Sequence, residues 1–176
     1  MAPGALAADG RGEGAGAGVR PVRHRTGVAR IAIDELEIQL LRPGAKAPRR
    51  TRPGDAGLDL HSVDDFRLAP GERLKVGTGV AIALPEQVCA LVVPRSGLAA
   101  DDGVAPFLGL VDPNFRGELC VTLLNSSRVE FVAAAGERIA QLLLLPFWAP
   151  ALRVVEELAP PPDDRGTSGW GSSGRD

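Results

Sequence analysis

The chain has 176 residues, a formal net charge of −2 and a hydrophobic fraction of 44%, which indicates one globular domain with a sizeable core. The small net charge argues against bulk electrostatic binding of nucleic acid, no apolar run approaches the ~20 residues of a membrane span, and the N-terminus lacks the apolar segment of a secretory signal. We therefore expect an intracellular protein, cytoplasmic or nuclear, with no stable nucleic-acid binding and no membrane contact.

The N-terminal segment, residues 1–30, is rich in Gly and Ala and has five arginines from Arg11 to Arg30. Such a composition cannot bury enough apolar surface to offset the entropy lost on ordering, so it predicts a disordered arm. Targeting, weak attraction of phosphate and an inert solvated tail all stay open as its role.

A domain of short β-strands is predicted over residues 31–158. Residues 36–40 alternate apolar and polar side chains, which is the pattern of a half-buried strand, and residues 80–84 repeat this spacing. Apolar runs of strand length follow at 88–93, 119–124, 129–132, 139–145 and 152–155. Turn residues separate nearly all of them, and only residues 97–100 indicate a helical turn. This regular spacing is typical of an all-β sandwich, jelly roll or barrel.

Two cysteines, Cys89 and Cys120, each lie among apolar residues. Their spacing fits no zinc motif. We expect two buried, reduced thiols, as is usual inside cells.

A glycine-rich tail, residues 159–176, follows the strands. Three prolines, 160–162, lead into Arg165 and a run of Gly, Ser and Thr around Trp170. Composition alone favours disorder, but a tryptophan is costly to leave exposed. As an alternative, the tail could wrap a phosphate with its amides and hydroxyls while Trp170 stacks on a base.

A possible phosphate-binding turn, Pro94–Leu98, comes directly after the apolar run at 88–93. Arg95, Ser96 and Gly97 present a cation, a hydroxyl and an unhindered backbone N–H, which are the groups that hold phosphate oxygens. The alternative is a surface turn in which Ser96 caps the helical turn that follows.

An aspartate at position 112 ends an apolar strand-and-turn segment, where carboxylates are rare. Asp112 could position and deprotonate a water molecule. Because Pro113 and Asn114 come next, it could also serve only as the first residue of a β-turn.

Asp59 lies between two leucines on an expected strand. An inward carboxylate there could hold Mg²⁺, most simply through water. The alternative is an ion pair with Arg49, Arg50 or Arg52. Farther along, Gln141 in the segment Gly136–Gln141 could donate a hydrogen bond to phosphate, a weak signal when taken alone.

These segments together resemble the five ordered motifs of the trimeric, all-β dUTP diphosphatase (dUTPase) family, from about Ile33 to the C-terminus. Asp55–Leu60 is similar to Ala-Gly-x-Asp-Leu, Pro94–Leu98 to Pro-Arg-Ser-Gly, Gly109–Gly117 to Gly-x-Ile/Val-Asp-x-x-Tyr-x-Gly, Gly136–Gln141 to Gly-x-Arg-Ile-Ala-Gln, and Arg165–Gly174 to Arg-Gly-x-x-Gly-Phe-Gly-Ser-Thr-Gly. Five motifs in one order make a specific signal, whereas each alone is weak.

The resemblance implies a distorted jelly-roll β-barrel that forms a homotrimer with exchange of the C-terminal arms. It implies Mg²⁺-assisted attack of water on the α-phosphorus of dUTP, giving dUMP and pyrophosphate, which limits uracil incorporation into DNA and supplies dUMP. Phosphoryl transfer of this kind depends mainly on positioning and charge neutralisation.

The resemblance also assigns roles to individual residues. Asp112 matches the residue that activates the water, and Asp59 matches the residue near the metal, held through water. The catalytic set is Asp112, Asp59 and Ser96, and the substrate-binding set is Arg95, Gly97, Gly109, Val111, Phe115, Gln141, Arg165, Trp170, Gly171 and Ser172.

Base and sugar recognition in the family comes from the third-motif hairpin, here about Ala105–Asn114, whose backbone leaves no room for the methyl group of thymine. Phe115 stands where the family has tyrosine and keeps the ring that excludes a 2′-hydroxyl. Trp170 replaces a stacking phenylalanine. The residues Pro106–Leu108 are bulkier than is usual in the family, which affects the fine shape of the base pocket.

Two other functions are compatible with parts of the pattern. A dCTP deaminase shares the fold but needs a glutamate base in the pocket, and here the third motif and the tail follow the dUTPase pattern. An interaction or signalling module on the dUTPase fold, with hydrolysis secondary, is allowed by the N-terminal arm and the two aromatic replacements. The retained acidic, basic and amide residues argue against it.

Overall fold

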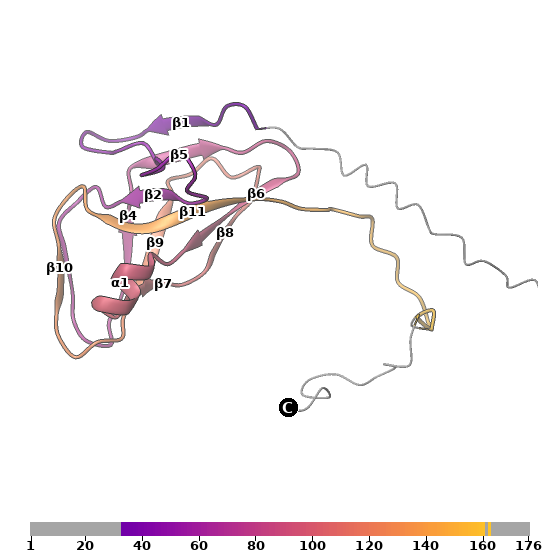
Figure 1. Ribbon diagram of the computed structural model, residues 1–176. Helices are drawn as coiled ribbons and strands as arrows, with labels where there is room; N and C mark the ends of the chain where they lie inside the picture. Colours follow the sequence, from indigo (N-terminus) through magenta and orange to yellow (C-terminus); the bar gives the residue numbers. More distant parts are fainter. Residues whose placement is uncertain (1–32, 161, 163–176) are drawn as a thin grey trace, which may run out of the picture. The chain divides into compact units, whose positions relative to one another are not determined.

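The computed structural model describes residues 33–160 and residue 162. All the described strands and the described helix lie within the unit Ile33–Asp176 (Figure 1). The predicted arm at residues 1–30 lies outside the described residues, as does most of the predicted tail at 159–176.

Short β-strands dominate the described part of the chain, which confirms the all-β prediction. The strands are β1 (Glu37–Leu40), β2 (Leu58–His61), β3 (Phe66–Leu68), β4 (Arg73–Gly77), β5 (Val80–Ala83), β6 (Val88–Val93), β7 (Val104–Pro106), β8 (Gly109–Val111), β9 (Cys120–Asn125), β10 (Phe131–Ala133) and β11 (Arg138–Pro146), and the helix is α1 (Ser96–Asp101). The apolar run at 88–93 coincides with β6, and the helical turn expected at 97–100 lies within α1. The short strands β3, β4 and β7 were not anticipated from the sequence.

The strands form antiparallel sheets that join distant parts of the chain (Figure 1). A four-stranded sheet has the order β2-β11-β6-β8, and a three-stranded sheet has the order β4-β9-β7, while β1 pairs with β5 and β10 with β3. Neighbouring strands are mostly not consecutive, so the chain crosses repeatedly between sheets, as it does in jelly rolls.

The core between these sheets is aliphatic. Along β6, Val88, Ala90 and Val92 are buried, whereas the alternate side chains are half-buried. The sequence therefore shows a continuous apolar run here, although the burial of its side chains alternates with a period of two. The largest fully buried side chains include Leu60, Leu68, Leu123, Ile139 and Leu142.

The two cysteines differ in part from the expectation. Both are free thiols, as predicted, but they are half-buried rather than buried. Cys89 alternates with the buried residues of β6, and Cys120 precedes the buried Val121 in β9, so both lie on the face of their strand turned from the core. Burial is still sufficient, with the nearby Glu118, to raise the pKa of the Cys120 thiol.

The strand predicted at 152–155 is wrong for the single chain. After β11 ends at Pro146, no strand is found among the described residues up to 160. Trp148, Leu152 and Val154 are 84%, 94% and 99% exposed. An isolated strand leaves its backbone groups and apolar side chains unpaired, and this segment has no partner strand within its own described chain.

No described helix is long and apolar enough to cross a membrane.

A buried asparagine at the end of β9 ties the end of β3 to the loop that follows β9. Asn125 is fully buried, its amide nitrogen donates to the carbonyl oxygens of Leu68 (2.9 Å) and Val129 (2.8 Å), and its Oδ1 accepts from Ser127 Oγ at 2.7 Å. The hydrogen bonds satisfy polar groups that burial would otherwise leave unpaired.

We predict that Asn125→Ala lowers the free energy of unfolding by about 2–4 kcal/mol, because it leaves the buried Leu68 carbonyl and the part-buried Val129 carbonyl without their donor and creates a cavity. Urea denaturation followed by circular dichroism measures the change. Asn114→Ala, at an exposed position, is the control and should change it by less than about 0.5 kcal/mol. Equal stability of the two variants would contradict the assigned role of Asn125.

Candidate active site

Three of the five segments meet on the four-stranded sheet. Gln141 of β11 lies opposite Asp59 of β2 on one side and opposite Val93 of β6 on the other. Arg95 follows β6 and immediately precedes α1. Residues directly opposite each other on a sheet present their side chains to the same face. The register therefore gathers a carboxylate, an amide and a guanidinium that are far apart in the sequence.

The carboxylate of Asp59 is the best-connected group in this region. Asp59 is only 7% exposed, and its Oδ2 accepts hydrogen bonds from Thr51 Oγ1 (2.9 Å) and Arg138 Nη1 (3.2 Å). Arg95 Nε lies 3.4 Å from Oδ1. The ion-pair alternative is thus realised, but with arginines of the second and fourth segments and not with the neighbours named from the sequence. Arg49 contributes only a backbone carbonyl, which accepts from the Asp59 N–H at 2.8 Å.

The environment of Asp59 stabilises its charged form. Burial alone would raise the pKa of Asp59, but the hydrogen bonds from Thr51 and Arg138 and the charges of Arg138 and Arg95 outweigh it and lower the pKa below its usual value. At neutral pH the group is therefore an anion held between two cations.

An open cavity of about 530 Å³ lies beside this carboxylate. Its lining includes Arg52, Asp55, Asp59, Arg95, Ser96, Arg138 and Gln141. Guanidinium, hydroxyl and amide donors thus converge on one space, which is an arrangement suited to phosphate oxygens. The lining unites candidates from the first, second and fourth segments.

Ser96 and Arg95 both line the cavity, and neither side chain caps α1. Ser96 is the first residue of α1, its N-cap is Arg95, and no side-chain hydrogen bond caps the helix, so the capping alternative for Ser96 is wrong. Arg95 Nη1 donates to the backbone carbonyl of Arg138 at 3.1 Å. Arg95 Nε is buried and has no hydrogen-bond partner in the described structure.

Gly57 provides the space that Gln141 occupies. A Cβ built at Gly57 would collide with the Gln141 amide oxygen. Sequence reasoning included Gly57 only within a motif, and it did not identify Thr51 or Arg138 as partners of Asp59. The sequence pointed to Arg138, because this residue belongs to the fourth segment, but it contained no pattern that pointed to Thr51.

The third segment does not reach this cavity within one chain. Because β8 runs antiparallel to β6, Gly109 lies opposite Val92, and Val111 lies opposite Ala90. The usual rise per residue of a strand therefore places Asp112 roughly 13 Å from Val93, measured along the direction of β6. The two ends of β6 carry different parts of the candidate site.

Asp112 begins a tight turn, as one of its two interpretations predicted. The Phe115 N–H donates to the Asp112 carbonyl oxygen at 3.1 Å, and the Asp112 side chain is exposed and has no hydrogen-bond partner in the described structure. Phe115 is 43% exposed. Its ring lies over Gly117, where an added Cβ would be 2.7 Å from the ring. A glycine at 117 is therefore needed for this position of the ring.

The hairpin expected to bind a base has two separated arms. β7 pairs with β9, whereas β8 pairs with β6, so the two strands are edges of different sheets. Phe107, Leu108 and Leu110 are 47%, 70% and 63% exposed. An unpaired edge carries free backbone donors and acceptors, which could pair with the polar edge of a base.

The remaining candidates, Arg165, Trp170, Gly171 and Ser172, lie outside the described residues. Within the described ranges, no three His, Cys, Asp or Glu side chains are grouped to enclose a metal ion.

Comparison with known proteins identifies the family of this chain. The family model described as dUTPase matches residues 44–174. The chain belongs to the dUTPase family. A deoxyuridine 5′-triphosphate nucleotidohydrolase from Leifsonia xyli subsp. xyli is 45% identical over 146 residues, which cover 80% of this chain and 92% of the relative.

Solved dUTPase structures show the same fold. A mutant dUTPase of Staphylococcus bacteriophage 80alpha with dUpNHpp is 28% identical, with a TM-score of 0.77 over 81% of this chain and 100% of that one. A mutant dUTPase of phage phi11 of S. aureus, described as revealing the coordination of a structural Mg(II) ion, is 26% identical, with a TM-score of 0.67 over 70% of this chain and 98% of that one. The dUTPase jelly roll predicted from the sequence is thereby confirmed.

We predict that Asp59 links the stability of this dUTPase to pH. Its folded pKa lies below the unfolded value of about 3.9. Its contribution is therefore complete above about pH 4 and is lost as the pH falls through the folded pKa. Asp59→Asn should lower the free energy of unfolding at pH 7 by about 1–3 kcal/mol, and the difference from wild type should shrink below pH 4.

Urea denaturation at fixed protein concentration from pH 7 to pH 3 measures this difference. Asp64→Asn is the matched control, since Asp64 pairs with Arg42 at 3.1 Å on the surface and surface pairs contribute little. A constant difference between wild type and Asp59→Asn across the whole range would contradict the prediction.

Proposed function

We propose that this chain hydrolyses dUTP to dUMP and pyrophosphate by attack of water on the α-phosphorus. The observation that carries the proposal is the cavity in which Arg95, Ser96 and Gln141 converge beside a buried, ionised Asp59, in a chain that belongs to the dUTPase family. Such chemistry requires positioning and charge neutralisation rather than a covalent intermediate.

The second segment and Gln141 bind the phosphate chain. Arg95 supplies a charged guanidinium in the cavity lining, Ser96 offers an exposed hydroxyl, and Gly97 leaves the backbone open to an anion. The Gln141 amide, held over Gly57, adds a neutral donor. These contacts orient the triphosphate and stabilise the leaving pyrophosphate.

Asp59 would contact, through water, a magnesium ion that is bound mainly by the substrate. Its two oxygens face Thr51, Arg95 and Arg138, and no further carboxylate cluster surrounds it in the described part of the chain. Mg²⁺ commonly keeps its waters and binds through one or two carboxylates and substrate phosphates. When bound, the ion neutralises phosphate charge in the transition state.

Asp112 orients and deprotonates the attacking water. Its carboxylate is exposed and unengaged within the described chain, so it is available to a ligand. Because Asp112 lies at the far end of β6 from Arg95, the two meet only if different chains of an oligomer share the site. We therefore assign the family's homotrimer to this protein, with residues 31–158 as the barrel and residues 159–176 as an arm that closes a neighbouring site.

The exposed apolar side chains support this assembly. Trp148, Leu152, Val154 and Leu158 are each more than 80% exposed along the segment that leaves β11. A run of exposed apolar residues marks a surface that a partner covers. Within the arm, Arg165 and Ser172 close over the phosphates, and Trp170 with Gly171 covers the base.

Base and sugar selection belongs to the third segment. The free edge of β8, from Gly109 to Val111, offers backbone groups to uracil. The Phe115 ring, seated on Gly117, packs on the deoxyribose and excludes a 2′-hydroxyl.

We expect Asp112→Asn to lower kcat for dUTP by about 10²–10⁴-fold, the usual contribution of a general base, with the fold unchanged because Asp112 is exposed. Pyrophosphate release from dUTP with Mg²⁺ is measured beside dTTP, dCTP and UTP. Asp34→Asn, another exposed aspartate, is the control and should keep full activity.

Three other outcomes would each contradict a different part of the proposed function. Undiminished hydrolysis by Asp112→Asn would remove it as the base. Hydrolysis of all four nucleotides would show that the Phe107–Phe115 region does not select uracil and deoxyribose. Binding of dUTP without hydrolysis by the wild type would favour the interaction-module alternative.

A mixing experiment tests the shared site. Asp112→Asn and Gln141→Ala chains should each be nearly inactive, but unfolding and refolding them together should restore a measurable fraction of wild-type activity. Mixed trimers then contain some sites that take Asp112 from one chain and Gln141 from another. Refolding each variant alone is the control, and absence of recovery in verified mixed trimers would contradict the division of the site between chains.

A further inference from the structure

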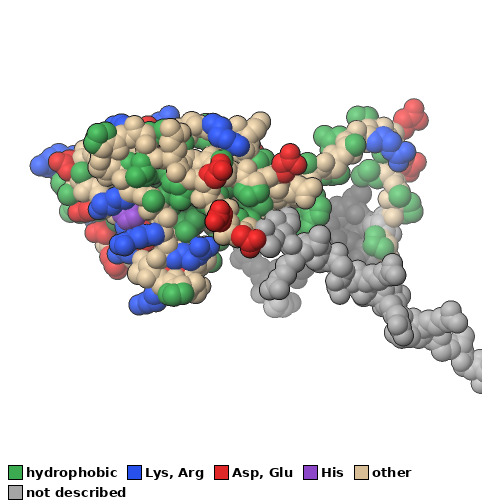
Figure 2. Space-filling model, turned by 90° about the horizontal axis from the view of Figure 1, so that it is seen from above, with side chains coloured by type: hydrophobic (Ala, Val, Ile, Leu, Met, Phe, Trp, Pro, Cys, Tyr) green, Lys and Arg blue, Asp and Glu red, His purple; other side chains and the backbone are tan. Residues whose placement is uncertain are grey.

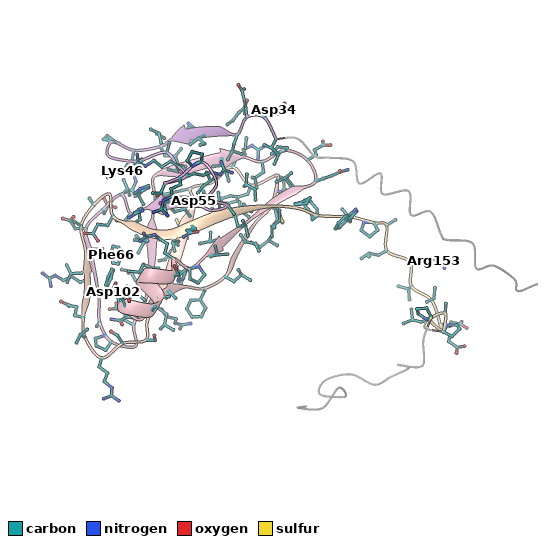
Figure 3. All side chains as sticks on the ribbon, viewed as in Figure 1. Asp34, Lys46, Asp55, Phe66, Asp102 and Arg153 are labelled. Carbon is teal, nitrogen blue, oxygen red and sulfur yellow. The ribbon has the colours of Figure 1, made fainter. Side chains whose placement is uncertain are left out.

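A second and larger cavity adjoins the substrate cavity. It has a volume of about 1190 Å³, against about 530 Å³ for the substrate cavity. Its lining includes Lys46, Arg49, Arg50, His61, Arg95 and Arg138. Lys46 and Asp102, which both line it, are labelled on the same side of the domain in Figure 3.

The lining of this cavity carries an excess of positive charge. Five Lys and Arg side chains line it, against two carboxylates, Asp102 and Glu137. Within the described part of the chain, Lys46 Nζ donates only to the Gly136 carbonyl at 3.0 Å, and Arg50 Nε only to the Asp55 carbonyl at 2.8 Å.

Among residues 33–160, no carboxylate lies within ion-pair distance of Lys46, Arg49 or Arg50. Figure 2 shows blue Lys and Arg side chains at several places on the visible face of the domain, with red Asp and Glu side chains among them. Several cations around one hollow repel each other, and an anion with more than one negative charge would relieve that repulsion.

His61 adds an unsatisfied polar atom to the same lining. The residue is only 5% exposed, and its Nδ1 has no hydrogen-bond partner in the described structure. Buried polar atoms in native proteins almost always have a partner. A ligand oxygen in the cavity would provide one, in addition to the charged contacts.

The two cavities share part of their walls. Thr51, Arg95 and Arg138 line both of them. Arg95 and Arg138 are anchored to Asp59 at 3.4 Å and 3.2 Å, so they form a fixed partition with cationic groups available to each side.

We propose that this larger cavity is a second anion site, which binds the pyrophosphate released from the neighbouring substrate cavity. The assignment of pyrophosphate rests on the proposed function, whereas the anion site itself rests on the charges and on His61. Lys46, Arg49 and Arg50 bind the anion's charge, and His61 Nδ1 contacts one of its oxygens.

Equilibrium dialysis of the full-length protein with labelled inorganic pyrophosphate tests the proposal. A non-hydrolysable dUTP analogue with an imido group between the α- and β-phosphorus atoms first saturates the substrate cavity. We expect one pyrophosphate per chain to bind beside the analogue. Lys46→Ala/Arg49→Ala should weaken that binding by about tenfold or more while the affinity for the analogue stays unchanged.

The matched control is Lys75→Ala/Arg128→Ala, which removes the same charges at exposed positions that do not line either cavity. The control should keep wild-type pyrophosphate binding. All four positions are exposed, so both variants should fold. Inorganic phosphate, run in parallel, should bind more weakly than pyrophosphate.

Three outcomes would overturn the proposal. Loss of pyrophosphate binding when the analogue is present would mean that there is one site only. An equal loss of affinity for analogue and pyrophosphate in Lys46→Ala/Arg49→Ala would make the larger cavity part of the substrate site. Equal affinity for phosphate and pyrophosphate would reject a diphosphate ligand.

Failure of the analogue to bind would instead contradict the proposed function. Pyrophosphate binding to wild type and to Lys46→Ala/Arg49→Ala, compared without the analogue, would then decide the anion site by itself. A tenfold difference would support it, and no difference would reject it.

Discussion

The site depends on the ion pairs and the hydrogen bonds that hold the buried carboxylate of Asp59. A charge in that position is tolerated only when it is paired, because its desolvation is costly. Thr51, Arg95 and Arg138 provide the partners, and they come from the loop before β2, the end of β6 and the start of β11. The same ion pairs that stabilise the carboxylate therefore fix the two arginines as the partition between the two cavities.

The register of the four-stranded sheet is the second constraint. Gln141 lies opposite both Asp59 and Val93, and a slip of one residue would turn its side chain to the other face. The buried residues of β11, such as Ile139 and Leu142, oppose such a slip because they would leave the core. Packing of the aliphatic core thus determines the position of the polar site.

Antiparallel pairing also separates the chemistry within one chain. β6 carries the proposed phosphate-binding segment at one end, and the register with β8 places Asp112 toward the other. The exposed side chains of Leu110, Leu152 and Val154 add apolar surface that the single chain does not cover. A shared site accounts for both observations, since assembly would bury the apolar surface and bring the separated groups together.

The sequence by itself determined the all-β class, the strand at 88–93 and the motif residues that indicate a dUTPase, because these depend on local pattern and on residue identity. It did not determine the partners of Asp59, for which the nearest arginines in the chain were the natural candidates. Arg95 and Arg138 replace them because strand pairing brings together residues that are distant in the sequence. The strand predicted at 152–155 failed for a related reason: an apolar run becomes a strand only where another strand pairs with it. Tertiary structure alone decided which charges are neutralised and which remain free to bind a ligand, since that depends on distances across the fold.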